Sequence, residues 1–458
     1  MSNRKMVNYL FLTRNANGNM RYSATADVKP RRPRPTLLYR MKDFLTNNVL
    51  AWIFHNWHIK KPFAYPTEAG ESIHPLTLAT DRVEVAECDD TDKGVKQDGS
   101  ITLCVTGDWA TSTPQAAFIG RQIACHQPDY TIHLGDTYYS GADDELADNY
   151  LTGASKSGIW PRGGSGSFAL LGNHEMYSSG GGFYRMIKDP ASRFGIRNPV
   201  GNTFTGQPVP FFCLSSDHWT IVGLDTGYDS LQRSCLKRLI NIHPTNLQLQ
   251  LPDLQLRWLR ENPDVLNPKK GIVLLSHHQY ISAFGGENEF AGPAVQMQPM
   301  LGNREVLWLW GHEHRFAMYD KYAAPGGITA NGRCIGNGSM MDEHLKERLP
   351  DPAKAVSRRL ALYDYRVADT FHFDSKAVDV GYNGYARLAI NGDGMEITYF
   401  QAYWNGDPKM KEFHQAAVRE NWRADGAGNV TRISFGDLTK DPMTRQSGLS
   451  YSAAGRSW

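Results

Sequence analysis

The chain has 458 residues, of which 41% are hydrophobic and 21% charged, as is ordinary for a globular protein. Its 49 basic and 47 acidic residues leave a formal net charge of +2, so charge alone predicts no nucleic-acid partner. The apolar runs are shorter than the roughly 20 residues of a membrane helix, and the N-terminal stretch is too short for a signal-peptide core. We therefore expect no membrane association and a cytoplasmic location.

The six cysteines are scattered without a C-x-x-C pair, which argues against a zinc ribbon or a redox motif. Cys104, Cys213 and Cys334 lie in apolar, strand-like stretches, and we expect reduced, buried thiols there. An even number of cysteines permits disulfides without requiring them.

Residues 1–95 carry no recognisable catalytic motif, and we treat them as an N-terminal extension of unknown role. The basic, proline-rich run 29–35 predicts extended backbone. Apolar residues near helical spacing over 44–53 predict a helix. Docking on the rest of the chain is favoured for this helix over binding to a membrane surface.

From residue 101 onward, apolar strands alternate with helices. The Thr113-Pro114 pair marks the start of one helix, and 252–262 has the pattern of another. This order implies parallel strands whose carboxyl ends share one edge of a sheet. Strands are predicted at 101–105, 130–134, 168–171, 218–224, 272–275 and 306–310.

Short strands follow His314, and Asn391-Gly392-Asp393-Gly394 between 385–390 and 395–400 predicts a hairpin. We expect a catalytic domain over 96–405. Residues 406–458 then form a C-terminal extension that is partly mobile.

Five short motifs follow the predicted strands, each at a corner between strand and loop. They supply carboxylate, amide and imidazole groups, which hard and borderline metal ions accept as ligands. The motifs are Gly107-Asp108-Trp109-Ala110, Gly135-Asp136-Thr137-Tyr138-Tyr139, Gly172-Asn173-His174-Glu175, Ser276-His277-His278 and Gly311-His312-Glu313-His314.

The number of ligand groups predicts two metal ions. His312 and His314 are two residues apart, so on a strand both side chains would point to one pocket. The full set exceeds the needs of one four-coordinate zinc ion and suits two ions about 3.5–4 Å apart. Its members are Asp108, Asp136, Asn173, His277, His312 and His314.

In these motifs the chain resembles the calcineurin-like metallophosphoesterase superfamily, over about residues 100–400. Ala110 stands where a metal-ligating histidine is usual in that superfamily. The run from Gly135 to Tyr139 matches Gly-Asp-x-x-Tyr, which is similar to the purple acid phosphatase branch. The resemblance implies a four-layer α/β/β/α sandwich of two mixed sheets flanked by helices, with extra N- and C-terminal segments.

The resemblance also implies two half-sites, one for Fe(III) and one for a divalent iron, zinc or manganese ion. Asp136 would bridge the two ions. The ferric half would use Asp108, Tyr139 and His314, and the divalent half would use Asn173, His277 and His312. Two alternatives stay open: Tyr138 lies nearer the metal than Tyr139, or His278 replaces His277 as the ligand.

A bridging hydroxide would then attack a phosphate ester. His174 would bind the phosphoryl group or protonate the leaving oxygen, and His278 would line the substrate side. We expect a phosphomonoesterase; the alternatives are a phosphodiesterase or nucleotide hydrolase on the same metals. A scaffold that binds partners through 1–95 is a third, less favoured hypothesis.

Overall fold

The structure is a computed structural model. It describes residues 11–14, 20–23, 62–79, 84–85, 99–151, 159–231, 245–373, 376–439 and 444–445. The expected proline-rich run 29–35 and the expected helix over 44–53 lie outside the described residues.

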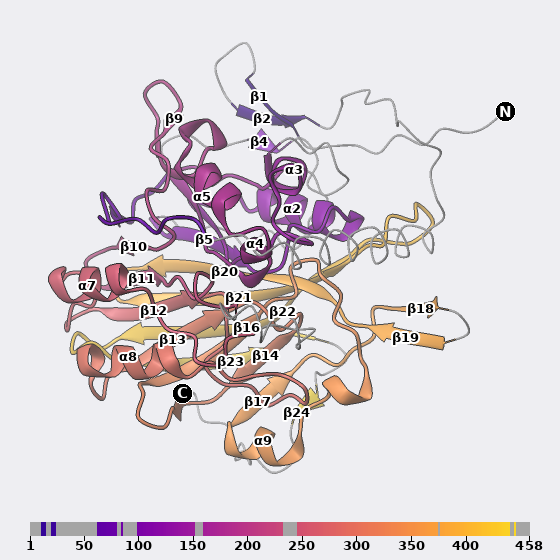
Figure 1. Ribbon diagram of the computed structural model, residues 1–458. Helices are drawn as coiled ribbons and strands as arrows, with labels where there is room; N and C mark the ends of the chain where they lie inside the picture. The colour runs from indigo at the N-terminus through magenta and orange to yellow at the C-terminus, as the bar shows by residue number, and fades with distance from the viewer. Residues whose placement is uncertain are drawn as a thin grey trace.

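Two large mixed sheets form the body of the molecule (Figure 1). The nine-stranded sheet has the strand order β23-β22-β21-β20-β5-β6-β7-β8-β9. The bounds in that order are Val430–Asp437, Phe413–Ala424, Gly394–Tyr403, Asn383–Asn391, Ile101–Thr106, Tyr130–His133, Gly166–Ala169, Gly195–Asn198 and Thr203–Phe204.

The ten-stranded sheet has the order β24-β17-β14-β16-β13-β12-β11-β10-β3, with β15 (Tyr322–Ala323) paired to β16. The bounds in that order are Thr444–Arg445, Leu360–Tyr363, Phe316–Tyr319, Thr329–Ile335, Glu305–Trp310, Gly271–Ser276, Trp219–Gly223, Phe212–Ser215 and Ile73–Pro75. A small three-stranded sheet contains β1 (Phe11–Arg14), β2 (Met20–Ser23) and β4 (Glu84–Val85). A two-stranded sheet pairs β18 (Asp369–Phe373) with β19 (Lys376–Val380).

Helices cover the outer faces of both large sheets. The α-helices are α2 (Pro114–Cys125), α3 (Asp143–Leu146), α4 (Asn173–Tyr177), α5 (Gly181–Lys188), α7 (Asp253–Glu261), α8 (Gly292–Leu301) and α9 (Pro352–Ser357). Shorter helical turns are η1 (Ala147–Leu151), η2 (Pro190–Ser192) and η3 (Lys346–Arg348).

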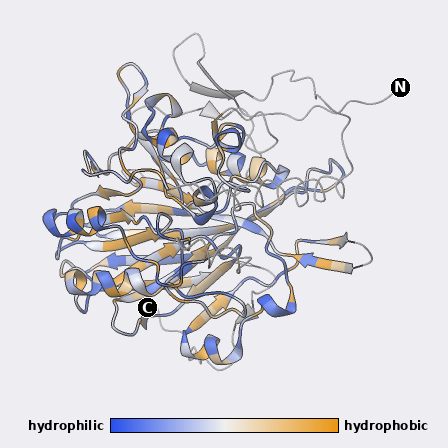
Figure 2. Cartoon of the chain, in the orientation of Figure 1, coloured by the Kyte–Doolittle hydropathy of each residue, from blue (hydrophilic) through white to orange (hydrophobic). Residues whose placement is uncertain are grey.

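Three apolar cores separate four layers. Alternate strand residues point to opposite faces, so Leu103 packs between the sheets while Cys104 packs under the helices α2 and α5. On the other sheet Leu307 faces the inter-sheet core, and Trp308 faces α7 and α8. Figure 2 shows the resulting hydrophobic strands in the middle of the molecule. The expected α/β/β/α sandwich is confirmed.

The predicted parallel strands bring the motifs to one edge. Strands β5, β6 and β7 are parallel neighbours, as are β11, β12 and β13. The predicted helix start is also confirmed: the hydroxyl of Thr113 accepts a hydrogen bond from Ala116 N at 3.3 Å, and Pro114 opens α2. The predicted hairpin is β20–β21, closed by the pair Asn391 and Gly394.

The two sheets extend beyond the predicted domain limits. Strand β3 lies before residue 96 yet pairs in parallel with β10. Strands β22 and β23 lie after residue 405 yet continue the nine-stranded sheet through β21. Each large sheet therefore includes strands from outside residues 96–405.

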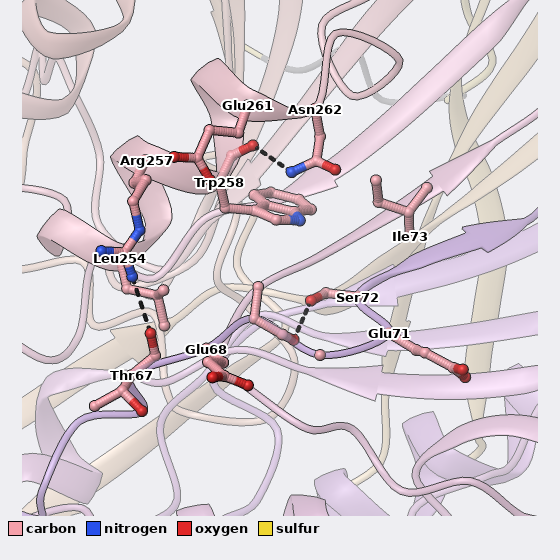
Figure 3. A pocket seen from close by; sticks show the side chains of 12 residues that line it. Thr67, Glu68, Glu71, Ser72, Ile73, Leu254, Arg257, Trp258, Glu261 and Asn262 are labelled. Carbon is pink, nitrogen blue, oxygen red and sulfur yellow. Dashed lines mark hydrogen bonds between the residues drawn. The ribbon is translucent and has the colours of Figure 1, made fainter.

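Residues 62–79, which include β3, form a strap beside β10 and α7. The hydroxyl of Tyr65 donates to Asp225 Oδ2 at 2.7 Å, and Arg257 Nη2 on α7 donates to the carbonyl of Thr67 at 2.9 Å. A pocket of about 460 Å³ lies between the strap and α7 (Figure 3). None of the predicted site residues lines it, so this pocket is separate from the five motifs.

The expected thiols are present in the core: Cys104, Cys213 and Cys334 are buried and free. Cys125, at the end of α2, is disulfide-bonded. Among the described residues, no helix is both long enough and apolar enough to cross a membrane.

A buried ion pair joins the two large sheets. Arg333 on β16 donates to both carboxylate oxygens of Glu420 on β22, at 2.9 and 2.7 Å. Both side chains are fully buried, and Arg432 adds a third bond to the same carboxylate at 3.1 Å. Although burial raises the pKa of Glu420, Arg333 and Arg432 outweigh it and leave that pKa below its ordinary value.

The substitution Arg333→Met should lower the free energy of unfolding by about 3–5 kcal/mol, because Glu420 loses its main partner inside the core. Urea unfolding measures this value. Arg423→Met is the matched control, since Arg423 and Asp393 form an exposed pair at 3.5 Å and should contribute less than about 1 kcal/mol. Equal effects of the two substitutions would contradict the prediction.

Candidate metal centre

The candidate ligands lie at sharp corners after the strands. Asp108, Asp136 and His312 have positive φ angles of 59°, 71° and 66°, which non-glycine residues adopt at a cost of about 1–3 kcal/mol each. Glycines beside them allow close packing: a Cβ on Gly172 would overlap the carboxylate of Asp136. The strained corners turn the ligand side chains toward one shared space.

One set of donor atoms surrounds the hydroxyl of Tyr138. This oxygen lies 2.7 Å from Asp108 Oδ1, 2.8 Å from His314 Nε2 and 3.4 Å from Asp136 Oδ2. His314 Nε2 lies 3.5 Å from Asp108 Oδ1. The set therefore joins two carboxylates, a phenol and an imidazole from both sheets.

A second set surrounds Nε2 of His277. This nitrogen lies 3.1 Å from Asn173 Oδ1, 3.2 Å from His312 Nδ1 and 3.3 Å from Asp136 Oδ2. Asp136 Oδ2 takes part in both sets, which is the position of a bridging carboxylate. The structure thus brings together all the predicted ligands except Tyr139.

The donor atoms fit two cations. The distances from Tyr138 Oη and from His277 Nε2 to the other donors of their sets are 2.7–3.4 Å, near the roughly 3 Å expected for neighbouring ligands on an ion with bonds of about 2.1 Å. When His277 Nδ1 donates to the carbonyl of Leu134, 3.1 Å away, Nε2 is left with a lone pair. Lone pairs of His277, Asn173 and Asp136 that face one another in a buried space are stabilised by a proton or a metal cation between them.

The pKa values of the clustered groups also support a cation-binding site. Burial raises the pKa of Asp108 to about 8, and Asp136 acts in the same direction. Burial also raises the pKa of Asp136, but His277 and His174 outweigh it and hold this pKa well below its ordinary value. Burial lowers the pKa of His277, but Asp136 and Asp108 bring it to about 9. Cations at this cluster would therefore displace protons.

Tyr139 was predicted as the phenol ligand, but the structure places the hydroxyl of Tyr138 among the donor atoms. The ring of Tyr139 lies beside that of His174, with 5.9 Å between centroids. Its carbonyl oxygen is 2.6 Å from His174 Nδ1. The number of residues from Asp136 could not show which of the two adjacent tyrosines faces the ligands. That choice depends on the local direction of the backbone at the corner.

His174 lies at the rim of both donor sets. Its backbone N–H donates to Asp136 Oδ1 at 2.9 Å, and Nδ1 can donate to the carbonyl of Tyr139. Nε2 then lies 3.7 Å from Asp136 Oδ2, on a side chain that is 14% exposed. The histidine predicted to contact substrate is therefore oriented by its neighbours and reachable from solvent.

His278 lies behind the second set, with its ring 4.7 Å from that of His312. Thr226 Oγ1 accepts from the backbone N–H of His278 at 3.0 Å and lies 3.2 Å from its Nδ1. His278 Nε2 is buried and has no hydrogen-bond partner within the described part of the chain. Both histidines of the Ser276-His277-His278 motif are thus close enough to take part in a metal site.

Two buried glutamates, Glu175 and Glu313, support the corners. Glu175 Oε2 accepts from the backbone N–H groups of Gly172 and Asp136 at 2.9 and 3.2 Å. Glu313 Oε2 accepts from Trp310 Nε1 at 3.1 Å. These carboxylates fix the backbone that presents the ligands.

A helix-flanked sandwich of two mixed sheets, with this donor set where the sheet edges meet, defines a metal-dependent phosphoesterase. Residues 101–316 match the family model described as calcineurin-like phosphoesterase. The resemblance to the calcineurin-like superfamily inferred from the motifs is thereby confirmed.

Three solved structures are among those similar to this chain. PhoD is 11% identical, with a TM-score of 0.44 over 75% of this chain and 73% of its own. GAP50, the anchor in the inner membrane complex of Plasmodium, is 10% identical, with a TM-score of 0.40 over 69% and 88%. A dimetal phosphatase from Danio rerio is 11% identical, with a TM-score of 0.36 over 69% and 98%. No curated protein matches the sequence.

The substitution Asp136→Asn should lower the metal content from about two ions per chain to one or none, because both donor sets share Asp136 Oδ2. Elemental analysis after gel filtration measures the metal content. His314→Ala should lower the metal content by one ion per chain. His218→Ala, at an exposed position, is the control and should retain both. Full metal content in Asp136→Asn would contradict a bridging carboxylate.

Proposed function

We propose that the chain is a phosphomonoesterase of the purple acid phosphatase type. The observation that carries the proposal is the hydroxyl of Tyr138, 2.7 Å from Asp108 and 2.8 Å from His314. A phenolate is a hard anionic ligand that stabilises a trivalent ion. Such a ligand in place of the histidine missing at Ala110 supports Fe(III) in the first donor set.

The proposed assignment gives each donor set one ion. Fe(III) would be held by Asp108, Tyr138 and His314, with Tyr138 in the role first expected of Tyr139. Asp136 would bridge to the second ion. Asn173, His277 and His312 would hold that divalent ion, for which iron, zinc and manganese all suit a site of amide oxygen and imidazole nitrogen.

When bound, two such ions polarise a phosphoryl oxygen and supply hydroxide near neutral pH. The residues of the chain position the reacting groups. The contact of His174 Nδ1 with the carbonyl of Tyr139 holds the ring with Nε2 toward the centre. There His174 can bind the phosphoryl group or give a proton to the leaving oxygen. The buried surroundings of the ligands strengthen both interactions.

The two tyrosines provide a spectroscopic test. A phenolate bound to Fe(III) gives a charge-transfer band in visible light, so the iron-loaded protein should be coloured. Tyr138→Phe should remove this band, and Tyr139→Phe should retain it, because only the first variant loses a phenol among the donor atoms. Iron content is measured in parallel. Loss of the band in Tyr139→Phe alone would reverse the assignment.

Turnover of two substrates tests the ester class. The metal-loaded protein should hydrolyse nitrophenyl phosphate with a kcat/KM at least about tenfold above that for bis(nitrophenyl) phosphate. We expect this preference because a dianionic phosphoryl group interacts more strongly with two cations than a monoanionic one. Release of nitrophenol measures both rates. Preference for the diester would support a phosphodiesterase. If neither ester is hydrolysed, the proposal that the chain is an enzyme is contradicted.

A further inference from the structure

The segment that follows the second motif folds back onto it. Helix α3 begins four residues after Tyr139, and η1 continues directly from α3. Two polar side chains of this segment, Glu145 and Asn149, are four residues apart and bond to the backbone of the turn that carries Tyr138. The segment is therefore placed to control where the hydroxyl of Tyr138 lies.

The carboxylate of Glu145 accepts four hydrogen bonds from this turn. The backbone N–H of Tyr139 donates to Oε1 at 2.7 Å, and those of Ser140 and Ala142 donate to Oε2 at 2.9 and 3.0 Å. The hydroxyl of Ser140 adds a bond to Oε2 at 3.1 Å. Capping of α3 requires only the bond from Ala142, which directly precedes the helix. The other three bonds fix the backbone just after Tyr138.

The side-chain amide of Asn149 bonds to the same turn from a buried position. Its Nδ2 donates to the carbonyl of Tyr138 at 3.1 Å and to that of Ala110 at 3.3 Å. The carbonyl of Ala110 also accepts from the backbone N–H of Tyr138 at 3.0 Å. Because Asn149 is only 3% exposed, these bonds are shielded from water. The amide thus links the motif that supplies Asp108 to the motif that supplies Tyr138.

Both peptide groups that flank Tyr138 are held by these contacts. Its N–H bonds to Ala110, its carbonyl bonds to Asn149, and the N–H of the next residue bonds to Glu145. The bonds fix the direction of the Cα–Cβ bond and with it the position of the hydroxyl at the far end of the ring. That hydroxyl lies within 2.8 Å of its two nearest donor atoms, so a small rotation of the backbone would remove it from the first donor set.

We propose that Asn149 and Glu145 are positioning residues that hold the phenol of Tyr138 against the first metal ion. The inference rests on the proposed function, which assigns Tyr138 a phenolate bond to Fe(III). Neither side chain belongs to the two donor sets, and each acts through the backbone that carries Tyr138. The amide of Asn149 suits this role because both of its hydrogens meet carbonyl oxygens, which a carboxylate in its place would repel. Since these bonds set the backbone direction, they determine that Tyr138 rather than Tyr139 supplies the phenol.

Loss of either side chain should weaken binding of the first ion. In Asn149→Leu and in Glu145→Gln, the affinity of the full-length chain for Fe(III), measured by competition with a chelator, should fall about tenfold or more. The visible band should shift or lose intensity per bound iron, because the phenolate no longer meets the ion in the same geometry. The affinity for the divalent ion should change much less, because neither side chain bonds to a residue of the second set.

Gln207→Leu is the matched control. Gln207 is fully buried, and its Nε2 donates to the carbonyls of Ala169 and Val209 at 2.9 and 3.0 Å. Its loss should lower the melting temperature by an amount similar to that in Asn149→Leu, yet leave the Fe(III) affinity and the visible band unchanged. The control therefore separates a positioning role from a general loss of stability.

Unchanged Fe(III) affinity and an unchanged band in both variants would overturn the inference, as would equal losses in Gln207→Leu. If Asn149→Leu fails to fold, Glu145→Gln decides by the same two measurements, because Glu145 is only partly buried.

A wild-type protein that gives no visible band with iron would contradict the proposed function and leave the positioning role to be decided separately. Calorimetry with Zn²⁺ then decides it. One of the two binding constants should still fall in Asn149→Leu and in Glu145→Gln, and two unchanged constants would overturn the inference.

Discussion

The close approach of the two sheets at one edge is the constraint on which the metal centre depends. A Cβ on Gly107, after β5, would lie 2.8 Å from the Cα of Gly311, after β13. Because only glycine permits this approach, Asp108 from one sheet accepts the backbone N–H of His312 from the other at 2.8 Å. A larger residue at either glycine would separate the carboxylates from the imidazoles.

The rest of the fold keeps this edge closed. Positive φ angles at the corners raise the energy of the folded state, and the packed sandwich offsets that cost. Glu175 and Glu313 hold the corners from behind, while Arg333 and Glu420 connect the sheets inside the core. The strap around Tyr65 contributes from outside, through Asp225 at the end of β11. A site with so many hydrogen-bond acceptors therefore depends on a rigid protein framework around it.

Much of this arrangement could be predicted from local patterns. Apolar runs followed by Gly-Asp, Gly-Asn or Gly-His mark strand ends, and parallel strands place their ends together. Parallel pairing of the strands that precede the motifs was predicted in this way, and the structure places Asp108, Asp136, Asn173 and His277 in one cluster. The domain limits at 96 and 405 stay a prediction, and β3 and the ribbon β22–β23 join the two sheets from outside them.

The sequence by itself determined the donor types and their positions at strand ends, because glycine-flanked carboxylates and histidines are readable in order along the chain. Only the tertiary structure decided which neighbour in each pair faces the centre. Tyr138 rather than Tyr139 joins the donor atoms, and His277 lies within 3.3 Å of Asn173, His312 and Asp136. The physical reason is that side-chain direction at a strained corner depends on backbone angles fixed by the opposite sheet and its distant loops.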